Sequence, residues 1–140
     1  MKKIILFILT TLLLTACIKN DVALEAKVSD FEGSGFKNKY GQLIILVEDG
    51  ILVASSRMIL SHEKTKKSSI DEVVEKENAE SGTSNLFKIY NKGKIETKGS
   101  KYYVTLDDNI SLEFEKTGQR IIKDSNGVVY FTQEFPNSNN

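Results

Sequence analysis

The stretch QLIILVEDGILVAS, residues 42–55, decides the fold. It holds two apolar runs, at residues 42–47 and 51–55, with Asp49-Gly50 between them. Aspartate followed by glycine is typical of a two-residue type I′ turn, because both central residues of that turn need a positive φ. The runs are rich in the aliphatic and β-branched residues that favour strands. The stretch therefore predicts an antiparallel β-hairpin.

The same organisation continues through the second half of the chain. Runs of Ile, Val, Leu, Tyr and Phe alternate there with short turn signals that contain Gly, Asn or Asp. We expect strands at residues 86–90, 94–97, 101–106, 110–115, 119–123 and 128–134. Together with the hairpin they make about eight strands joined in sequence, an antiparallel meander.

Residues 110–115 show the clearest alternation of apolar and polar side chains. Ile110, Leu112 and Phe114 fall on one face of a strand, and the polar residues between and after them fall on the other. A meander of about eight strands avoids exposed edges most simply by closing into a barrel. The predicted fold class is therefore mainly β, a small lipocalin-like barrel. The alternative is an open antiparallel sheet or sandwich, whose sequence pattern is nearly the same.

The side chains inside such a barrel decide whether it has room for a ligand. Those expected to fill it are Leu43, Ile45, Ile110, Leu112, Phe114 and Phe131. If they fill the interior, no cavity remains. If the interior is short of side chains, we expect a pocket for a small apolar ligand.

One polar segment, residues 61–84, interrupts the β pattern. Within it Ile70, Val73 and Val74 have helical spacing, residues 69–72 (Ser-Ile-Asp-Glu) fit a capping box, and Gly82 is a stop signal. We expect a short amphipathic helix over residues 70–80, lying across one mouth of the barrel or one edge of the sheet. The alternative is a solvated loop, because so short a helix is marginal without tertiary contacts.

The composition restricts the classes of partner and the domain organisation that we expect. The 140 residues include 19 basic and 19 acidic side chains, one cysteine and one histidine. Such a near-neutral balance argues against nucleic acid as a partner. The length fits one domain with a hydrophobic core. A domain without disulfides has to be stabilised by packing alone.

Catalytic and metal-binding residues are scarce in this chain. His62 lies in a charged run at residues 61–67, where a solvated histidine is expected, and no Ser-His-Asp or Cys-His pairing is indicated. Without a Cys-x-x-Cys or a second imidazole there is no motif for zinc. We therefore expect no enzyme activity and no cofactor.

Two groups of acidic residues are candidate sites. Asp107, Asp108 and Asn109 lie between two expected strands, as a weak calcium site or, more simply, as a hairpin loop. The glutamates of the expected helix, at positions 72, 75, 77 and 80, are interspersed with Lys76, which indicates a solvated face. Neither group predicts acid–base chemistry.

Adjacent aromatic residues are the candidates for partner contact. Tyr102 and Tyr103 point to opposite faces of one strand, as do Tyr130 and Phe131 of another. One ring of each pair therefore lies outside the core. These outward rings are candidates for contact with another protein.

The N-terminal stretch MKKIILFILTTLLLTAC, residues 1–17, resembles the signal peptide of a bacterial lipoprotein. It has two lysines, an eleven-residue apolar core at residues 4–14, and a Leu-Thr-Ala-Cys lipobox that ends at Cys17. The core is about half the length that spans a bilayer. The resemblance implies that Cys17 receives a diacylglycerol thioether, becomes the new N-terminus and is N-acylated. This cleavage removes two lysines and leaves 17 basic and 19 acidic residues.

The expected domain organisation follows from this resemblance. Residues 1–16 are the signal peptide, 17–34 the lipidated N-terminus and tether, 35–135 the β domain, and 136–140 a flexible tail. In the alternative, part of the tether packs as a first strand. Because Ile18 rather than Asp follows Cys17, the resemblance implies the outer membrane in a diderm bacterium and the outer face of the cell membrane in a monoderm.

The exported domain is similar in pattern to small lipocalin-like envelope lipoproteins of the NlpE N-terminal type. The similarity rests on the Leu-rich strand with Asp-Gly at residues 43–50, a Gly-x-Ile-x-x-x-Gly stretch at 93–99, and a last strand after Asn126-Gly127. That family carries a Cys-x-x-Cys near its first strand, and this chain has none. The similarity therefore implies the fold and not copper handling.

The function expected from the sequence is a membrane-anchored, non-catalytic protein-binding module of the cell envelope. An inhibitor or immunity protein and an accessory subunit of a larger envelope assembly both belong to this class. The alternative is a lipocalin-like carrier of a small apolar ligand.

Overall fold

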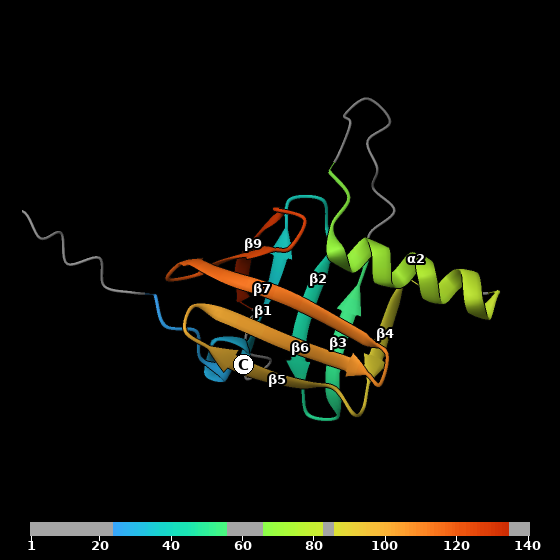
Figure 1. Ribbon diagram of the computed structural model, residues 1–140, viewed down its shortest axis with the longest axis horizontal. Coiled ribbons are helices and arrows are strands. Elements are labelled where there is room, and N and C mark those ends of the chain that lie inside the picture. The colour runs from blue at the N-terminus through green and yellow to red at the C-terminus, as the bar shows by residue number, and fades with distance from the viewer. Residues whose placement is uncertain (1–23, 56–65, 83–85, 135–140) are drawn as a thin grey trace, which may run out of the picture.

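The computed structural model describes residues 24–55, 66–82 and 86–134, and the nine strands within them form one curled antiparallel sheet (Figure 1). The strands are β1 (Ser34–Asn38), β2 (Leu43–Val47), β3 (Gly50–Ala54), β4 (Phe87–Tyr90), β5 (Lys94–Lys98), β6 (Lys101–Asp107), β7 (Ile110–Gly118), β8 (Ile121–Asp124) and β9 (Val129–Glu134). Two helical segments accompany them, the 3-10 turn η2 (Val28–Phe31) and the helix α2 (Ser69–Ser81). The mainly β fold with one helix is confirmed.

The strand order explains the half-barrel shape. It runs β4-β3-β2-β1-β9-β8-β7-β6-β5, so the first strand of the chain pairs with the last, with Phe36 opposite Thr132. Strands β4 and β5 form the two ends of the sheet. The sheet is a lipocalin-like barrel that stays open between these two strands. Figure 1 shows β5, β6 and β7 crossing steeply in front of β1, β2 and β3, and the core lies between these layers.

The connection between β4 and β5 differs from the expected hairpin. Gly93 N–H donates to the Tyr90 carbonyl at 2.9 Å, and a Cβ at Gly93 would lie 3.0 Å from the Ile51 side chain. The turn therefore packs against β3 and carries the chain from one layer to the other. Tyr90 before the turn and Ile95 after it both bury their side chains in the core. The strands β4 and β5 do not pair with each other and lie at opposite ends of the sheet.

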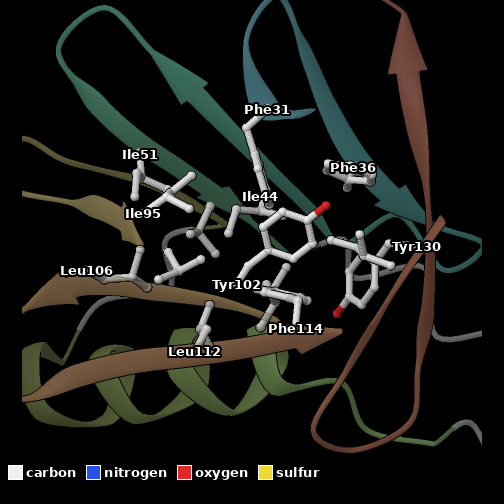
Figure 2. Close-up of a cluster of buried hydrophobic side chains, with 14 of the residues drawn as sticks. Phe31, Phe36, Ile44, Ile51, Ile95, Tyr102, Leu106, Leu112, Phe114 and Tyr130 are labelled. Atoms are coloured by element: carbon white, nitrogen blue, oxygen red, sulfur yellow. The ribbon is translucent and has the colours of Figure 1, made fainter. Parts of the chain in front are cut away.

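Aromatic and branched side chains fill the space between the layers (Figure 2). Phe31 packs edge-on against Phe36 and Tyr102, with ring centroids 4.8 and 5.2 Å apart, and Phe114 packs in the same way against Tyr130 at 5.5 Å. All but Phe36, which is 2% exposed, are fully buried. Such edge-to-face pairs add to the stabilisation that burial provides.

The predicted facing of residues is right where the sequence alternates and wrong where it does not. Leu112 and Phe114 are buried and Ile110 packs against the core, as expected. In β2, however, Ile44 is the fully buried residue, so Leu43 and Ile45 lie on the outer face. Phe131 is also on the outside and is 52% exposed. A continuous apolar run contains no alternation from which the inner face can be read.

The domain begins before the expected boundary. The sequence predicts a tether over residues 17–34, whereas in the structure Ala26 and Phe31 are buried in the core. Ala26 N–H donates to the Gly99 carbonyl at 2.8 Å, which attaches this segment to the turn between β5 and β6. Strand β1 was missed because its sequence, SGFKN, has one large apolar residue. Residues 17–23 and the expected tail at 136–140 lie outside the described residues.

Helix α2 forms where the spacing predicted it. Its N-cap is Ser68, one residue before the expected capping box, and the Ser68 side chain accepts from the Asp71 N–H at 3.1 Å. Gly82 ends the helix with a positive φ of 67°, which glycine adopts without strain. Ile70 and Val74 are buried, and the helix packs against β3 and β7. None of the described helices has the length and apolar character needed to cross a membrane.

Candidate functional site

The two layers of the sheet differ in the chemistry of their outer surfaces. On the layer formed by β5–β8, charged side chains of neighbouring strands pair with each other. Lys101 pairs with Glu113, and the Lys123 ammonium lies 3.3 Å from the Glu115 carboxylate. These groups are substantially exposed, as is usual for a solvated sheet face.

The outer surface of β2, β3 and β4 is apolar instead. Antiparallel register aligns two rows of side chains across these strands. The rows are Leu43–Ala54–Phe87 and Ile45–Leu52–Ile89, and we refer to these six residues as the apolar outer face. Directly opposed residues of an antiparallel pair share one face of the sheet, so the six side chains form one continuous surface.

The apolar outer face ends on the neighbouring strand β1. Gly35 lies opposite Ile45, and a Cβ at Gly35 would come within 2.4 Å of Ile45 Cγ1. Glycine at this position leaves room for the isoleucine side chain to lie over β1. Any larger residue here would displace Ile45 and disrupt the surface.

Phe87 and Ile89 make the β4 end of this surface the most exposed. Phe87 is 64% exposed and Ile89 is 43% exposed. Strand β4 is also an end of the sheet, and within the described residues no strand pairs with its outer edge. Proteins usually protect such an edge with charged side chains, proline or a bulge. The outward residues of β4 are apolar, which is typical of an edge that binds another chain.

The backbone of β4 presents hydrogen-bonding groups at this edge. Ser55 N–H donates to the Leu86 carbonyl at 2.7 Å, which fixes the hydrogen-bonding phase between β3 and β4. Hydrogen-bonded pairs recur at every second residue of an antiparallel ladder. Lys88 and Tyr90 therefore bond towards β3, and the N–H and C=O groups of Phe87 and Ile89 point to the outer edge.

A groove of about 390 Å³ lies beside this edge, between β4 and the C-terminal half of α2. It is lined by Val74, Glu77, Asn78, Glu80, Ser81, Phe87 and Lys88. Glu77 holds the two elements together, because it accepts from the Tyr90 hydroxyl at 2.6 Å and from Lys88 Nζ at 2.8 Å. Burial and the Glu77 carboxylate both raise the pKa of the Tyr90 hydroxyl, so Tyr90 remains a neutral donor.

The buried carboxylates of the domain have structural roles. Asp124 accepts hydrogen bonds from Ser69 N–H at 2.9 Å, from Val128 N–H at 2.8 Å and from the Tyr130 hydroxyl at 3.0 Å. It therefore joins the start of α2 to the turn between β8 and β9. These hydrogen bonds engage both carboxylate oxygens and give Asp124 a structural role.

A second polar cluster joins the N-terminal segment to the sheet. Asp30 accepts from Lys27 N–H, from Lys116 Nζ at 2.9 Å and from the Tyr102 hydroxyl. Burial alone would raise the pKa of Asp30, but the hydrogen bonds from Tyr102 and Lys116 outweigh it and lower the pKa. The cluster fixes η2 over the core.

The candidate acidic residues that the structure describes lie in a turn and on a helix and do not form a common site. Cys17 and His62 lie outside the described residues. Asp107 ends β6, and Asp108 and Asn109 form the tight turn to β7. Asp107 Oδ1 accepts from Asp108 N–H at 2.7 Å, which is the hairpin-loop role. Across residues 24–55, 66–82 and 86–134, no three His, Cys, Asp or Glu side chains cluster as metal ligands.

The helix glutamates and the paired aromatics are placed as follows. Glu72, Glu75 and Glu80 are exposed, as expected, whereas Glu77 is partly buried against β4. Tyr102 and Tyr130 are the inward rings, and Tyr103 and Phe131 are the exposed ones.

Sequence reasoning did not identify the apolar outer face. A signal for it was present, because residues 43–47 and 51–54 are apolar at consecutive positions. Such runs are typical of strands that are covered on both faces. In this structure only one face of these strands is covered by the core.

Comparison with known proteins gives no relative: no protein-family model, no curated protein and no solved structure matches this chain.

Proposed function

We propose that the protein is a lipid-anchored lipoprotein of the bacterial cell envelope that binds another envelope protein through its apolar outer face. The anchor is the lipid on Cys17, in the outer membrane of a diderm or on the outer face of a monoderm membrane. The bound protein is either a hydrolase that the domain inhibits or a larger assembly of which the domain is an accessory subunit.

The apolar outer face is the observation that carries the binding role. Its two rows of side chains run continuously over three strands and end at an unpaired strand edge within the described part of the chain. The equivalent surface of the other layer carries paired charges. A contiguous apolar patch on the surface of a domain marks a protein interaction site.

The interior of the barrel supports a binding module more than a small-molecule carrier. Tyr102, Tyr130, Phe31 and Phe114 are fully buried in contact with one another, where a carrier needs an open cavity. The hollows described around residues such as Phe87, Tyr103 and Lys116 open at the surface of the domain.

A position-specific cross-linking experiment tests the proposal. A photoreactive amino acid replaces Leu52, on the apolar outer face, or Glu113, on the charged outer surface, in cells that make the full-length protein. We expect one protein to be captured in high yield from position 52 and not from position 113. Equal capture from both positions, or capture of lipid alone from position 52, contradicts the proposal.

A further inference from the structure

We propose that the outer edge of β4 accepts an extended segment of the partner as an additional strand, and that this segment alternates apolar and basic residues. The inference rests on the proposed function and specifies which part of the partner binds. Three features of the β4 edge carry it, namely its backbone groups, the side chains on its two faces and the position of α2.

The backbone supplies the first argument. The N–H and C=O groups of Phe87 and Ile89 point away from β3, as the hydrogen bond from Ser55 N–H to the Leu86 carbonyl requires. No described strand pairs with them. An extended chain laid along this edge bonds to these groups in the same way that β3 bonds to the other side of β4.

The outward side chains define one face of the incoming segment. A strand beside β4 extends the rows that end at Phe87 and Ile89. Its residues on this side therefore lie next to a phenylalanine and an isoleucine that are 64% and 43% exposed. Apolar side chains contribute the most favourable binding free energy at this position, because they remove the surface of both residues from water.

Helix α2 defines the other face. Figure 1 shows the helix running beyond β4, and its C-terminal half lines the groove beside the strand. The helix carries five acidic residues and one lysine, Lys76. Glu77 is engaged by Lys88 and Tyr90, whereas Glu80, which also lines the groove, forms no ion pair with any residue the structure describes. Basic side chains on the inner face of the incoming segment complement this charge.

A second copy of this chain fits the edge less well. Two copies that pair through β4 are related by a two-fold axis, so each surface meets its own counterpart. Because α2 lies beside the edge, the two acidic helices approach each other and Lys88 approaches the Lys88 of the other copy. Like charges at short range oppose this pairing. The partner is therefore a different chain.

Binding of labelled synthetic peptides to the full-length protein in detergent tests the inference. One peptide alternates valine and lysine, and a matched peptide alternates valine and glutamate. Fluorescence anisotropy should show saturable binding of the valine–lysine peptide, with affinity for the valine–glutamate peptide weaker by about five-fold or more. Equal binding of the two peptides, or no binding of either, overturns the inference.

Two substitutions locate the site of binding. Ile89→Pro removes an N–H that points to the outer edge and not to β3, so β4 is retained and the valine–lysine peptide no longer binds. Ile89→Val is the matched control and binds normally. If Ile89→Pro lowers the thermal unfolding midpoint substantially, Glu80→Lys on the exposed helix face is used as the test variant instead. We expect Glu80→Lys to bind the valine–glutamate peptide more tightly than the valine–lysine peptide. Unchanged binding by Ile89→Pro in a folded protein, or an unchanged preference in Glu80→Lys, overturns the inference.

The remaining outcomes separate this inference from the proposed function. Cross-linking from position 52 without peptide binding leaves the binding role standing and removes the edge as its site. Peptide binding without any cross-linked protein shows that the β4 edge binds an extended segment, and it contradicts the proposed binding role of the apolar outer face. A dimer in sedimentation that Ile89→Pro dissociates assigns the edge to a second copy and overturns the inference.

Discussion

The Tyr102 hydroxyl donates a hydrogen bond to Asp30, 72 residues away, and Lys116 Nζ lies 2.9 Å from the same carboxylate oxygen. The two contacts attach the N-terminal segment to β6 and β7. They also lower the pKa of Asp30 below its ordinary value of 3.8.

Asp30→Asn should destabilise the fold in a pH-dependent manner. Because the folded-state pKa is lowered, the charged carboxylate contributes stability above the unfolded pKa near 3.8, and this contribution is lost as the pH falls through the folded pKa. Urea unfolding should show a loss of about 2 kcal/mol at neutral pH. The difference between the proteins should shrink below about pH 3.8. In a Lys116→Met background the effect of Asp30→Asn should be smaller, and an effect independent of pH would contradict this account.

Phe114→Ala should lower the free energy of unfolding by about 3–5 kcal/mol, because it opens a cavity beside Tyr130 in the fully buried core. Tyr103→Ala is the control on the exposed face of the neighbouring strand and should change stability by less than about 1 kcal/mol. Denaturant titrations of both variants measure the difference. Similar losses for the two would mean that the facing of β6 and β7 is wrong.

Asp124→Leu should cost about 3 kcal/mol or more, because it leaves the buried donors of Ser69, Val128 and Tyr130 unpaired. The loss should be greatest at the N-terminus of α2, where hydrogen exchange of the first helical amides should accelerate. Asp108→Leu, in the exposed turn between β6 and β7, is the control. Unchanged exchange in α2 would show that Asp124 does not hold the helix.

Phe87→Glu should leave the free energy of unfolding within about 0.5 kcal/mol, since the ring is 64% exposed. The same change places a charge on the apolar outer face and should abolish cross-linking of a partner from position 52. Thermal unfolding and cross-linking are measured on the same preparation. A folded Phe87→Glu protein that is still captured in full would exclude the β4 end of this face from the contact.

Cys17→Ala should prevent lipidation, so that the protein is recovered as an uncleaved precursor or as a soluble species. Intact mass and membrane fractionation measure the two properties. A single acyl chain holds a protein only reversibly, whereas two or three anchor it stably. An unchanged mass and an unchanged membrane fraction would contradict the lipoprotein proposal.

Local signals account for much of this fold. The Asp49-Gly50 signal predicts the β2–β3 hairpin, the alternation from Ile110 to Phe114 predicts the inner face of β7, and the spacing of Ile70 and Val74 predicts α2. The predicted type I′ turn itself is wrong: Val47 pairs with Gly50, so the loop is residues 48–49, and no described residue other than glycine has a positive φ. Each of these features depends on residues close together in the chain. Such patterns identify elements well because the backbone period and the turn geometry are set locally.

The features that sequence did not predict depend on distant contacts. Strand β1 has few apolar residues and exists because it pairs with both β2 and β9. The outward position of Ile45 follows from the burial of Ile44 within a continuous apolar run. Glu77 looked like a solvated helix residue, but β4 brings Tyr90 and Lys88 to it. Pairing partners of this kind are fixed by tertiary structure and not by local pattern.

The attachment of Ala26 to Gly99 has a consequence for orientation. The N-terminal segment joins the domain at the turn between β5 and β6, whereas β4 and the C-terminal half of α2 lie at the other end of the long axis (Figure 1). For a protein held at its N-terminal end, the membrane is on the β5–β6 side. The edge of β4, with which no described strand pairs, then lies on the side of the domain that faces away from the bilayer.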